Sequence, residues 1–182
     1  MEQLAVVDEN NQVQGFSLKE DILRRGLNYR CIQVFLFNAK DELIICRRPD
    51  SKKKFAGKFA SSAMGYIRKD ETYEDAAKRE MMQELGVNKI LKKAAEFKIE
   101  DGNSVVFQEI WKGALSDEIE PDKTEIAEYK YVSLEDLEQA MQLEPDKFTE
   151  PFITAVKAFV HARVEGVPKD KVEEQAGLKE FS

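Results

Sequence analysis

Cysteine and histidine are scarce in this chain of 182 residues, which has two of the first and one of the second. Cys31 and Cys46 each lie inside an apolar, strand-like run, a setting typical of buried, reduced thiols. The sequence therefore supports neither a disulfide nor a metal site built on a cysteine pair. We expect His161, in the last predicted helix, to be an ordinary surface or packing residue.

Long apolar runs and an excess of positive charge are also missing. No apolar run approaches the roughly 20 residues that a membrane-spanning helix needs. The first ten residues, MEQLAVVDEN, have neither the basic region nor the apolar core of a signal peptide. The net charge of -7 gives no overall electrostatic case for nucleic-acid binding. We therefore expect a cytoplasmic protein without a membrane or nucleic-acid partner.

The composition that remains is typical of a soluble globular protein. Apolar residues make up 42% of the chain and charged residues 35%, which is too apolar for a disordered segment. The length suits one domain with a sizeable core. We predict a single domain over residues 1–165, with an N-terminal hairpin and a C-terminal helix, followed by a polar tail at 166–182.

Hydrophobic periodicity and turn residues divide the chain into strands and helices. Residues 30–37 are too continuously apolar for a half-exposed strand and indicate a central strand buried on both faces. Ser17 and Glu20 fit a capping box at the start of a helix, and Asp101-Gly102 predicts a hairpin turn. Strands are expected at 4–7, 13–16, 30–37, 43–46, 59–67, 91–99, 105–111 and 129–132, and helices at 17–26, before Gly86, at 134–142 and from 149 onward. Mixed strands with helices in this order suit a three-layer α/β/α sandwich.

Residues 65–87, GYIRKDETYEDAAKREMMQELGV, carry the strongest functional signal. The pattern predicts a glycine-ended turn followed by an amphipathic helix that stops at Gly86. Positions three and four apart share one helix face, so Glu80, Gln83 and Glu84 project together from the last turns. Acidic groups clustered at this end repel one another and oppose the helix dipole. A hard divalent cation bound by their oxygens would offset that repulsion, and Mg2+ or Mn2+ is the expected ion.

This stretch resembles the Nudix box: Gly, five residues, Glu, seven residues, Arg-Glu, an apolar residue, any residue, Glu-Glu, any residue, Gly and an apolar residue. The single departure is Gln83, where the family usually has the first Glu of its Glu-Glu pair. The other fixed positions agree, at Gly65, Glu71, Arg79, Glu80, Met81, Glu84, Gly86 and Val87. The similarity extends from about Leu4 to Val164, and residues 4–16 resemble the isopentenyl-diphosphate-isomerase-like branch. It implies the Nudix fold, a mixed β-sheet in an α/β/α sandwich.

The resemblance also implies catalytic and metal-binding roles. It assigns metal binding to Glu80 and Glu84, and either of them could accept the proton of the attacking water. Gln83 stands where relatives often have a further ligand, and its uncharged oxygen predicts one weakened metal position. Many relatives add a carboxylate from a later loop. Glu125 is the first choice here and Glu128 the second, although both also fit solvated loop charges.

Other positions of the motif have structural roles in relatives. Glu71 and Arg79 would form an ion pair that fixes the loop against the helix, and Gly65 and Gly86 would shape its two ends. The backbone carbonyl of Met64 commonly completes the metal shell in relatives.

A basic segment precedes the motif. Between residues 47 and 58, six cations face only Asp50 as an opposing charge, a concentration that could hold the phosphates of a nucleotide or another diphosphate. Arg47 and Arg48 are the preferred substrate-binding residues because they leave a strand beside the expected site, and Lys58 is a further candidate. The three consecutive lysines at 52–54 are more typical of a solvated loop.

These observations predict a metal-dependent hydrolase that cleaves the diphosphate linkage of a nucleoside diphosphate derivative or a related small molecule. The alternative is a catalytically weak Nudix domain that binds a nucleotide-like ligand for regulation, which Gln83 favours. An isopentenyl-diphosphate isomerase is less favoured, because Met64 and Tyr66 stand where those enzymes have a catalytic cysteine and a metal-binding histidine. A homodimer, common among relatives, stays open.

Three strand aromatics are candidates for stacking on a nucleobase. Phe107, Trp111 and Tyr131 could each stack on a nucleobase, but aromatic residues in strands more often pack in the core or on the sheet.

Overall fold

A computed structural model describes residues 1–165 of the chain. The predicted polar tail, residues 166–182, lies outside the described residues. The elements are β1 (Gln3–Val7), β2 (Val13–Leu18), α1 (Lys19–Arg25), β3 (Asn28–Phe37), β4 (Glu42–Arg47), β5 (Phe59–Ala60), β6 (Ala63–Tyr66), α2 (Tyr73–Leu85), β7 (Lys92–Asp101), β8 (Ser104–Ala114), β9 (Glu128–Ser133), α3 (Leu134–Leu143), a 3-10 turn η1 (Pro145–Lys147) and α4 (Glu150–Glu165).

Strand β3 is the centre of a mixed sheet, as its apolar sequence predicts. It runs parallel to β8 over its whole length and antiparallel to β6 and to the end of β1. It meets β4 only at Phe37 and Leu43, and β4 in turn pairs with β5 and β9. Residues 32 and 34–36 of β3 are completely buried. A strand covered on both faces needs apolar residues at successive positions, which explains the unbroken apolar run.

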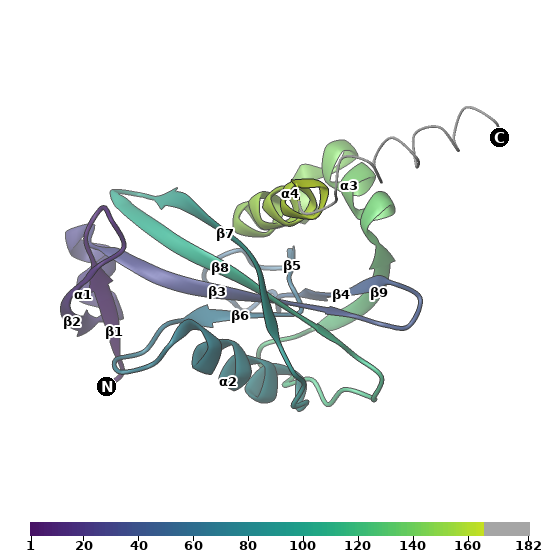
Figure 1. Ribbon diagram of the computed structural model, residues 1–182, viewed down its shortest axis with the longest axis horizontal. Coiled ribbons are helices and arrows are strands. Elements are labelled where there is room, and N and C mark those ends of the chain that lie inside the picture. The colour runs from purple at the N-terminus through teal and green to yellow at the C-terminus, as the bar shows by residue number, and fades with distance from the viewer. Residues whose placement is uncertain (166–182) are drawn as a thin grey trace.

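The sheet lies between two helical layers (Figure 1). Helix α2 packs on one face, where Ala76, Ala77, Met81 and Leu85 join the apolar residues of β3 and β4. Helices α3 and α4 cover the other face through a second apolar cluster that includes Phe35, Phe152 and Phe159. The α/β/α sandwich predicted from the sequence is therefore confirmed. Within residues 1–165, no helix combines the length and apolar character needed to cross a membrane.

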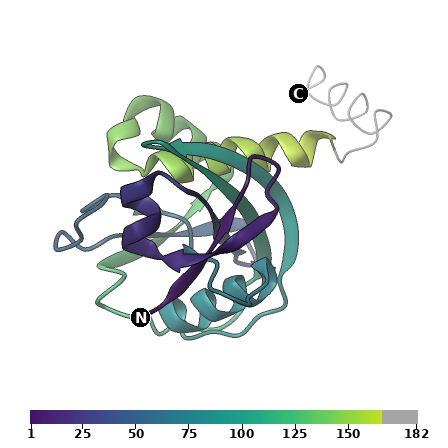
Figure 2. The ribbon, with the colours of Figure 1, turned by 90° about the vertical axis from the view of Figure 1, so that its left-hand side faces the viewer.

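The N-terminal hairpin and α1 lie across one end of the sheet (Figure 2). They pack through a third cluster in which Leu4 and Ile22 contact Tyr29, Cys31 and Val106. The predicted capping box at Ser17 is wrong: Ser17 belongs to β2, and α1 begins after an N-cap residue, Leu18, that makes no side-chain capping bond. Packing against the sheet fixes this short helix in place of a cap.

Both ends of α2 are fixed by local hydrogen bonds. Thr72 and Asp75 form a reciprocal capping box at its start. Gly86 ends it in the left-handed conformation, with φ of 68°, and donates to the carbonyl of Met82. The acidic loop that follows β8 adds a further backbone hydrogen bond, in which the amide of Asp122 donates to the carbonyl of Glu84 at 2.9 Å. These contacts hold the last turn of α2 in a defined position.

The strand predicted at 59–67 is divided into β5 and β6. β5 pairs with β4, whereas β6 pairs with β3. A buried serine between these two strands explains the division. The Ser62 hydroxyl accepts from the amide of Leu36 at 3.0 Å and donates to the carbonyl of Ile44 at 2.7 Å. It thereby bridges β3 and β4 where their backbones diverge. The other predicted strands and helices are confirmed within a few residues at their ends.

Candidate active site

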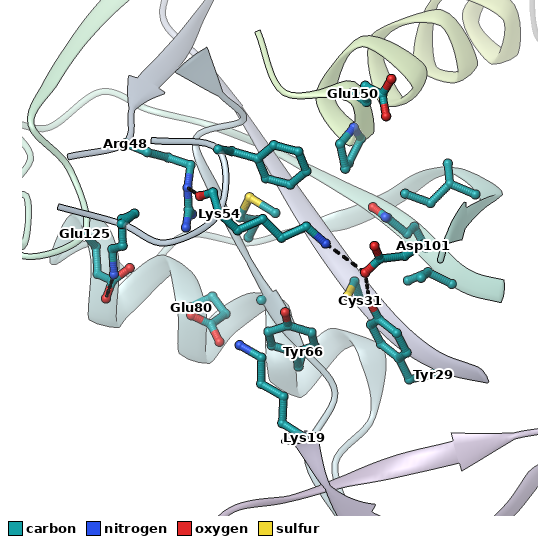
Figure 3. Close-up of a pocket in the computed structure, with 18 of the residues that line it drawn as sticks. Lys19, Tyr29, Cys31, Arg48, Lys54, Tyr66, Glu80, Asp101, Glu125 and Glu150 are labelled. Carbon is teal, nitrogen blue, oxygen red and sulfur yellow. Dashed lines mark hydrogen bonds and ion pairs between the residues drawn. The ribbon is translucent and has the colours of Figure 1, made fainter. Parts of the chain in front are cut away.

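One cleft of about 1340 Å³ runs beside the last turns of α2 (Figure 3). Its walls come from segments far apart in the sequence: α1, the loop of residues 48–58, β6, α2, the β7–β8 hairpin, the acidic loop and the start of α4. The end next to α2 carries Glu80, Gln83 and Glu84. The other end is lined largely by apolar and aromatic side chains, among them Tyr29 and Ile99.

Arg79 organises the end next to α2. Its Nε and Nη2 donate to the two carboxylate oxygens of Glu71 at 2.7 and 3.0 Å, and Nη2 also donates to the carbonyl of Tyr66 at 3.0 Å. The Arg68 amide adds a third bond to Glu71, at 2.9 Å. Burial acts to raise the pKa of Glu71, but these hydrogen bonds outweigh it and lower the pKa. The result is a nearly buried bidentate ion pair, a geometry that fixes the turn before α2 against the helix.

The same guanidinium also holds the carboxylate of Glu80. Arg79 Nη1 forms an ion pair with Glu80 and lies 3.4 Å from Gln83 Oε1. The Glu80 side chain lies directly against Gly65, where there is no room for a β-carbon. The positions of Gly65, Arg79 and Glu80 therefore depend on one another. Glycine is required at residue 65 because the Glu80 side chain approaches it closely, and not because of its backbone conformation, since its φ is not positive.

The surroundings of Glu80 and Glu84 disfavour the charged form of their carboxyl groups. Burial raises the pKa of Glu80, with the Arg79 guanidinium opposing the change. Burial, followed by the charges of Glu80 and Glu125, raises the pKa of Glu84 well above its ordinary value, although the Met64 amide opposes this. Carboxyl groups that are buried near one another gain from a nearby cation. This pair therefore has the electrostatic character of a cation site.

The donors present fit a magnesium-type ion. Within residues 1–165, no three acidic, histidine or cysteine side chains converge into a complete cage. Mg2+ is usually bound through one or two carboxylates together with substrate phosphates and water, so a complete protein cage is not expected. Glu80 and Glu84 supply the carboxylates, and Gln83 and the backbone of Met64 offer further oxygens at the same end of the cleft.

The two candidate loop carboxylates occupy different places. Glu125 lines the cleft, and Lys52 Nζ donates to it at 2.7 Å. Glu128 is the first residue of β9, pairs with Arg47 at 3.2 Å and is not among the residues that line the cleft. The structure thus brings Glu125, and not Glu128, to the carboxylates of α2.

The predicted cations are also divided. Arg48 lines the cleft and donates from Nε to the carbonyl of Lys54 at 3.1 Å. Arg47 and Lys58 do not line it, since Arg47 pairs with Glu128 and Asp50 outside. Lysines 52–54, which are more typical of a solvated loop, all line the cleft, and Lys53 and Lys54 are exposed there. Consecutive residues leaving a strand point in different directions, so one arginine of the pair faces the cleft.

Two cationic residues complete the cleft from unexpected directions. Lys19, the first residue of α1, places Nζ 4.3 Å from the centre of the Tyr66 ring. Lys54 crosses the cleft to donate to Asp101 at 2.8 Å, and Tyr29 donates to the same oxygen at 2.8 Å (Figure 3). Sequence reasoning missed Lys19 and Asp101 because no local pattern connects them with residues 65–87.

The predicted stacking residues lie elsewhere. Phe107, Trp111 and Tyr131 do not line the cleft, and Trp111 packs against the α2-side core while its Nε1 donates to Glu109 at 2.9 Å. The aromatic rings in the cleft are those of Tyr29, Phe55 and Tyr66. His161 is largely exposed on α4 next to Glu165, as expected, and both cysteines are buried free thiols.

The family model for the NUDIX domain matches residues 28–152. This chain belongs to the Nudix family. Residues 1–27, which include Lys19 in the cleft, lie outside this match.

Individual relatives agree with this assignment. The chain is 28% identical to an isopentenyl-diphosphate Delta-isomerase 2 from Photorhabdus laumondii, over 89% of this chain and 94% of that protein. It is 32% identical to an uncharacterized Nudix hydrolase from Streptomyces coelicolor, over 64% and 68%. A prenyl-diphosphate phosphatase from Methanosarcina mazei is 24% identical over 80% and 88%.

The fold has close counterparts among solved structures. A protein from Deinococcus radiodurans has a TM-score of 0.75 at 24% identity, covering 86% of this chain and 98% of that one. A MutT protein from Methanosarcina mazei has a TM-score of 0.64 at 20% identity, covering 78% and 96%. These similarities show the Nudix fold.

Proposed function

We propose that this Nudix protein is a Mg2+- or Mn2+-dependent hydrolase that cleaves the diphosphate linkage of a small molecule. The observation that carries the proposal is the meeting, in one cleft, of the partly buried Glu80 and Glu84 with Arg48 and Lys52 from the facing loop. Carboxylates suit a divalent cation and arginine suits phosphate oxygens. A diphosphate bridging the two sets would satisfy both.

The residues of the chain have distinct tasks in this reaction. Arg48 and Lys52 of the loop at residues 48–58, with Lys19 of α1, bind and orient the diphosphate. Glu80 and Glu84 would hold the divalent ion, which when bound would supply neutralisation of phosphate charge and activation of water. One of these carboxylates accepts a proton as the water oxygen bonds to phosphorus and the bridging P–O bond breaks. The products are a monophosphate and a second phosphorylated fragment.

Candidate substrates include nucleoside diphosphate derivatives and, from the names of relatives, prenyl diphosphates. We do not propose the isomerase reaction for this chain, because Met64 cannot supply a thiol and Tyr66 is a poor replacement for an imidazole ligand. Cys31 lines the same cleft, but burial raises the pKa of its thiol, so it stays protonated.

A regulatory ligand-binding domain is the second candidate function. Gln83 favours it, because the amide that replaces the usual carboxylate supplies no charge to the metal. Ligand binding without metal-dependent turnover would support this alternative.

The test is product release from a broad panel of diphosphates with Mg2+ and with Mn2+, comparing the wild type with Glu84→Gln. Glu74→Gln is the matched control, since Glu74 lies on the same helix but pairs with Lys78 outside the cleft. We expect turnover in the wild type and the control and a loss of at least about 100-fold in Glu84→Gln. A folded wild type without turnover on any substrate would overturn the hydrolase proposal.

A further inference from the structure

Two buried glutamines lie side by side beneath the cleft. Gln33 on β3 is 1% exposed and Gln108 on the parallel strand β8 is 4% exposed. The Gln33 amide nitrogen donates both its protons, to Gln108 Oε1 at 2.8 Å and to the carbonyl of Pro151 at 3.0 Å. Polar side chains this deeply buried carry defined hydrogen-bonding roles.

The backbone of Pro151 fixes the orientation of both amides. A carbonyl oxygen only accepts, so Gln33 must direct its NH2 group toward Pro151. The same NH2 group also faces Gln108, which must therefore present its oxygen. Reversing either amide would place two donors or two acceptors together. The orientation of Gln108 is thus set by the contacts, although oxygen and nitrogen alone would be hard to distinguish.

This arrangement leaves one donor group directed away from Gln33. Gln108 lines the cleft, and within the described residues no hydrogen bond uses its Nε2. Its neighbours in the cleft include the apolar side chains of Ile99, Val106 and Ile153. Gln33 Oε1 is itself buried without a partner in the described part of the chain. A buried oxygen without a hydrogen-bond partner is energetically unfavourable. This oxygen belongs to the same Gln33 amide whose two protons fix the orientation of Gln108.

The strand order places Gln108 away from the metal end. Helix α2 packs beside β6, which pairs with β3, and β3 pairs with β8. Two strand spacings across the sheet amount to roughly 10 Å. A diphosphate bound beside α2 would therefore direct its organic group, and not its phosphates, toward Gln108.

We propose that Gln108 is a specificity-determining residue, which donates from Nε2 to an acceptor atom on the organic group of the substrate. The chemical class that fits is a nucleoside diphosphate derivative, whose base carries carbonyl oxygens and ring nitrogens. A plain hydrocarbon chain would displace water from Gln108 and leave its donors unpaired, which disfavours it. This inference rests on the proposed diphosphate-binding function and selects among its substrates. Gln33 is the positioning residue.

The first test compares kcat/KM for the four common nucleoside diphosphates and for geranyl diphosphate. We expect the wild type to prefer at least one nucleoside substrate over geranyl diphosphate by 10-fold or more. Gln108→Met should lower kcat/KM for that nucleoside substrate about 10-fold and should raise kcat/KM for geranyl diphosphate, because no donor is then left unpaired. Gln142→Met, on the exposed surface of α3, is the matched control. A wild-type preference for geranyl diphosphate, or equal losses on both substrates in Gln108→Met, would overturn the proposal.

Two further variants separate donation from packing. Gln108→Glu can still accept from Gln33 but presents an acceptor to the cleft, so it should also lose the nucleoside preference. Gln33→Met removes the orienting bonds, and should raise KM for the nucleoside substrate with little change in kcat. Full retention of the preference in both variants would contradict the assigned roles.

Binding measurements separate this inference from the hydrolase proposal. Calorimetry in Mg2+ would compare α,β-methylene nucleoside diphosphates, which resist cleavage between the phosphates, with methylenediphosphonate, which lacks an organic group. Gln108→Met should weaken the tightest nucleoside analogue about 10-fold and leave methylenediphosphonate unchanged. Absence of wild-type turnover would end the hydrolase proposal, while this binding comparison would still decide the role of Gln108. Equal affinities of wild type and Gln108→Met for the nucleoside analogues would overturn it.

Discussion

The Glu80 carboxylate rests directly against the Gly65 backbone, so a β-carbon on residue 65 would collide with Glu80 Oε1. Gly65→Ala should therefore displace Glu80 from its place beside Arg79, because the colliding atoms belong to that side chain and not to the backbone. We expect at least a 10-fold loss of turnover and weaker Mn2+ binding, with the fold retained by circular dichroism. Gly15→Ala is the control, since a β-carbon there meets no atom within 4 Å. Unchanged Mn2+ affinity in Gly65→Ala would show that Glu80 is not a ligand.

The uncharged side chain of Gln83 should limit metal affinity. Gln83→Glu adds a carboxylate at the metal end of the cleft, and a hard cation binds a carboxylate better than an amide oxygen. Arg79 Nη1, 3.4 Å from Gln83 Oε1, would share the new charge, so we expect an increase of only about three- to tenfold in Mn2+ affinity. Calorimetry measures this, with Gln142→Glu on α3 as the control for added charge. Equal affinities for wild type and Gln83→Glu would remove residue 83 from the metal site.

Adjacent arginines should have different effects on substrate binding. Arg48 lines the cleft, whereas Arg47 pairs with Glu128 outside it. We expect Arg48→Ala to raise KM for a diphosphate substrate about 10-fold, which corresponds to the loss of one charged hydrogen bond, and Arg47→Ala to change KM less than twofold. Arg48→Lys distinguishes charge from the contact with the Lys54 carbonyl. A larger KM effect in Arg47→Ala than in Arg48→Ala would reverse the assignment.

Asp101 should contribute to stability only when it is ionised. Burial acts to raise its pKa, but the hydrogen bonds from Lys54 and Tyr29 outweigh this and lower it. A carboxyl group whose pKa falls on folding stabilises the protein above its unfolded pKa of about 3.9, and this contribution disappears as the pH falls through the folded pKa. Because Lys54 and Asp101 are both partly exposed, we expect Asp101→Asn to lose about 0.5 kcal/mol of unfolding free energy at pH 7.

Urea unfolding at pH 7 and near pH 3 would measure the effect of Asp101→Asn. The difference from wild type should shrink toward zero at the lower pH. Asp146→Asn is the control, because Asp146 is exposed and forms no ion pair within the described residues. A difference that grows on acidification would have the wrong sign for an ionised, hydrogen-bonded Asp101.

Much of the fold follows from local signals in the sequence. The apolar run of β3, the cap at Ser133 and the glycine that ends α2 each act within a few residues, so periodicity and capping rules locate them. The division of residues 59–67 into two strands could not be predicted from the local sequence. It depends on the Ser62 hydroxyl, which forms hydrogen bonds to β3 and β4.

The metal end of the site could also be located from the sequence, since one helix carries its carboxylates at fixed spacing. The opposite end could not. Lys19 meets Tyr66, and Lys54 meets Asp101, only because the sheet brings distant segments together. The role proposed for Gln108 depends in the same way on the carbonyl of Pro151, which no local pattern connects with it.

Helix α1 lies outside the residues that the family model matches, yet its Lys19 and Leu23 form part of the cleft wall. The residues beside the expected metal and those beside the organic group therefore belong to separate pieces of the chain. Substitutions at well-separated positions act nearly independently. Descendants of this protein could consequently change the molecule they recognise by altering α1 or the β7–β8 hairpin, while residues 65–86 and the bond-breaking chemistry stay the same.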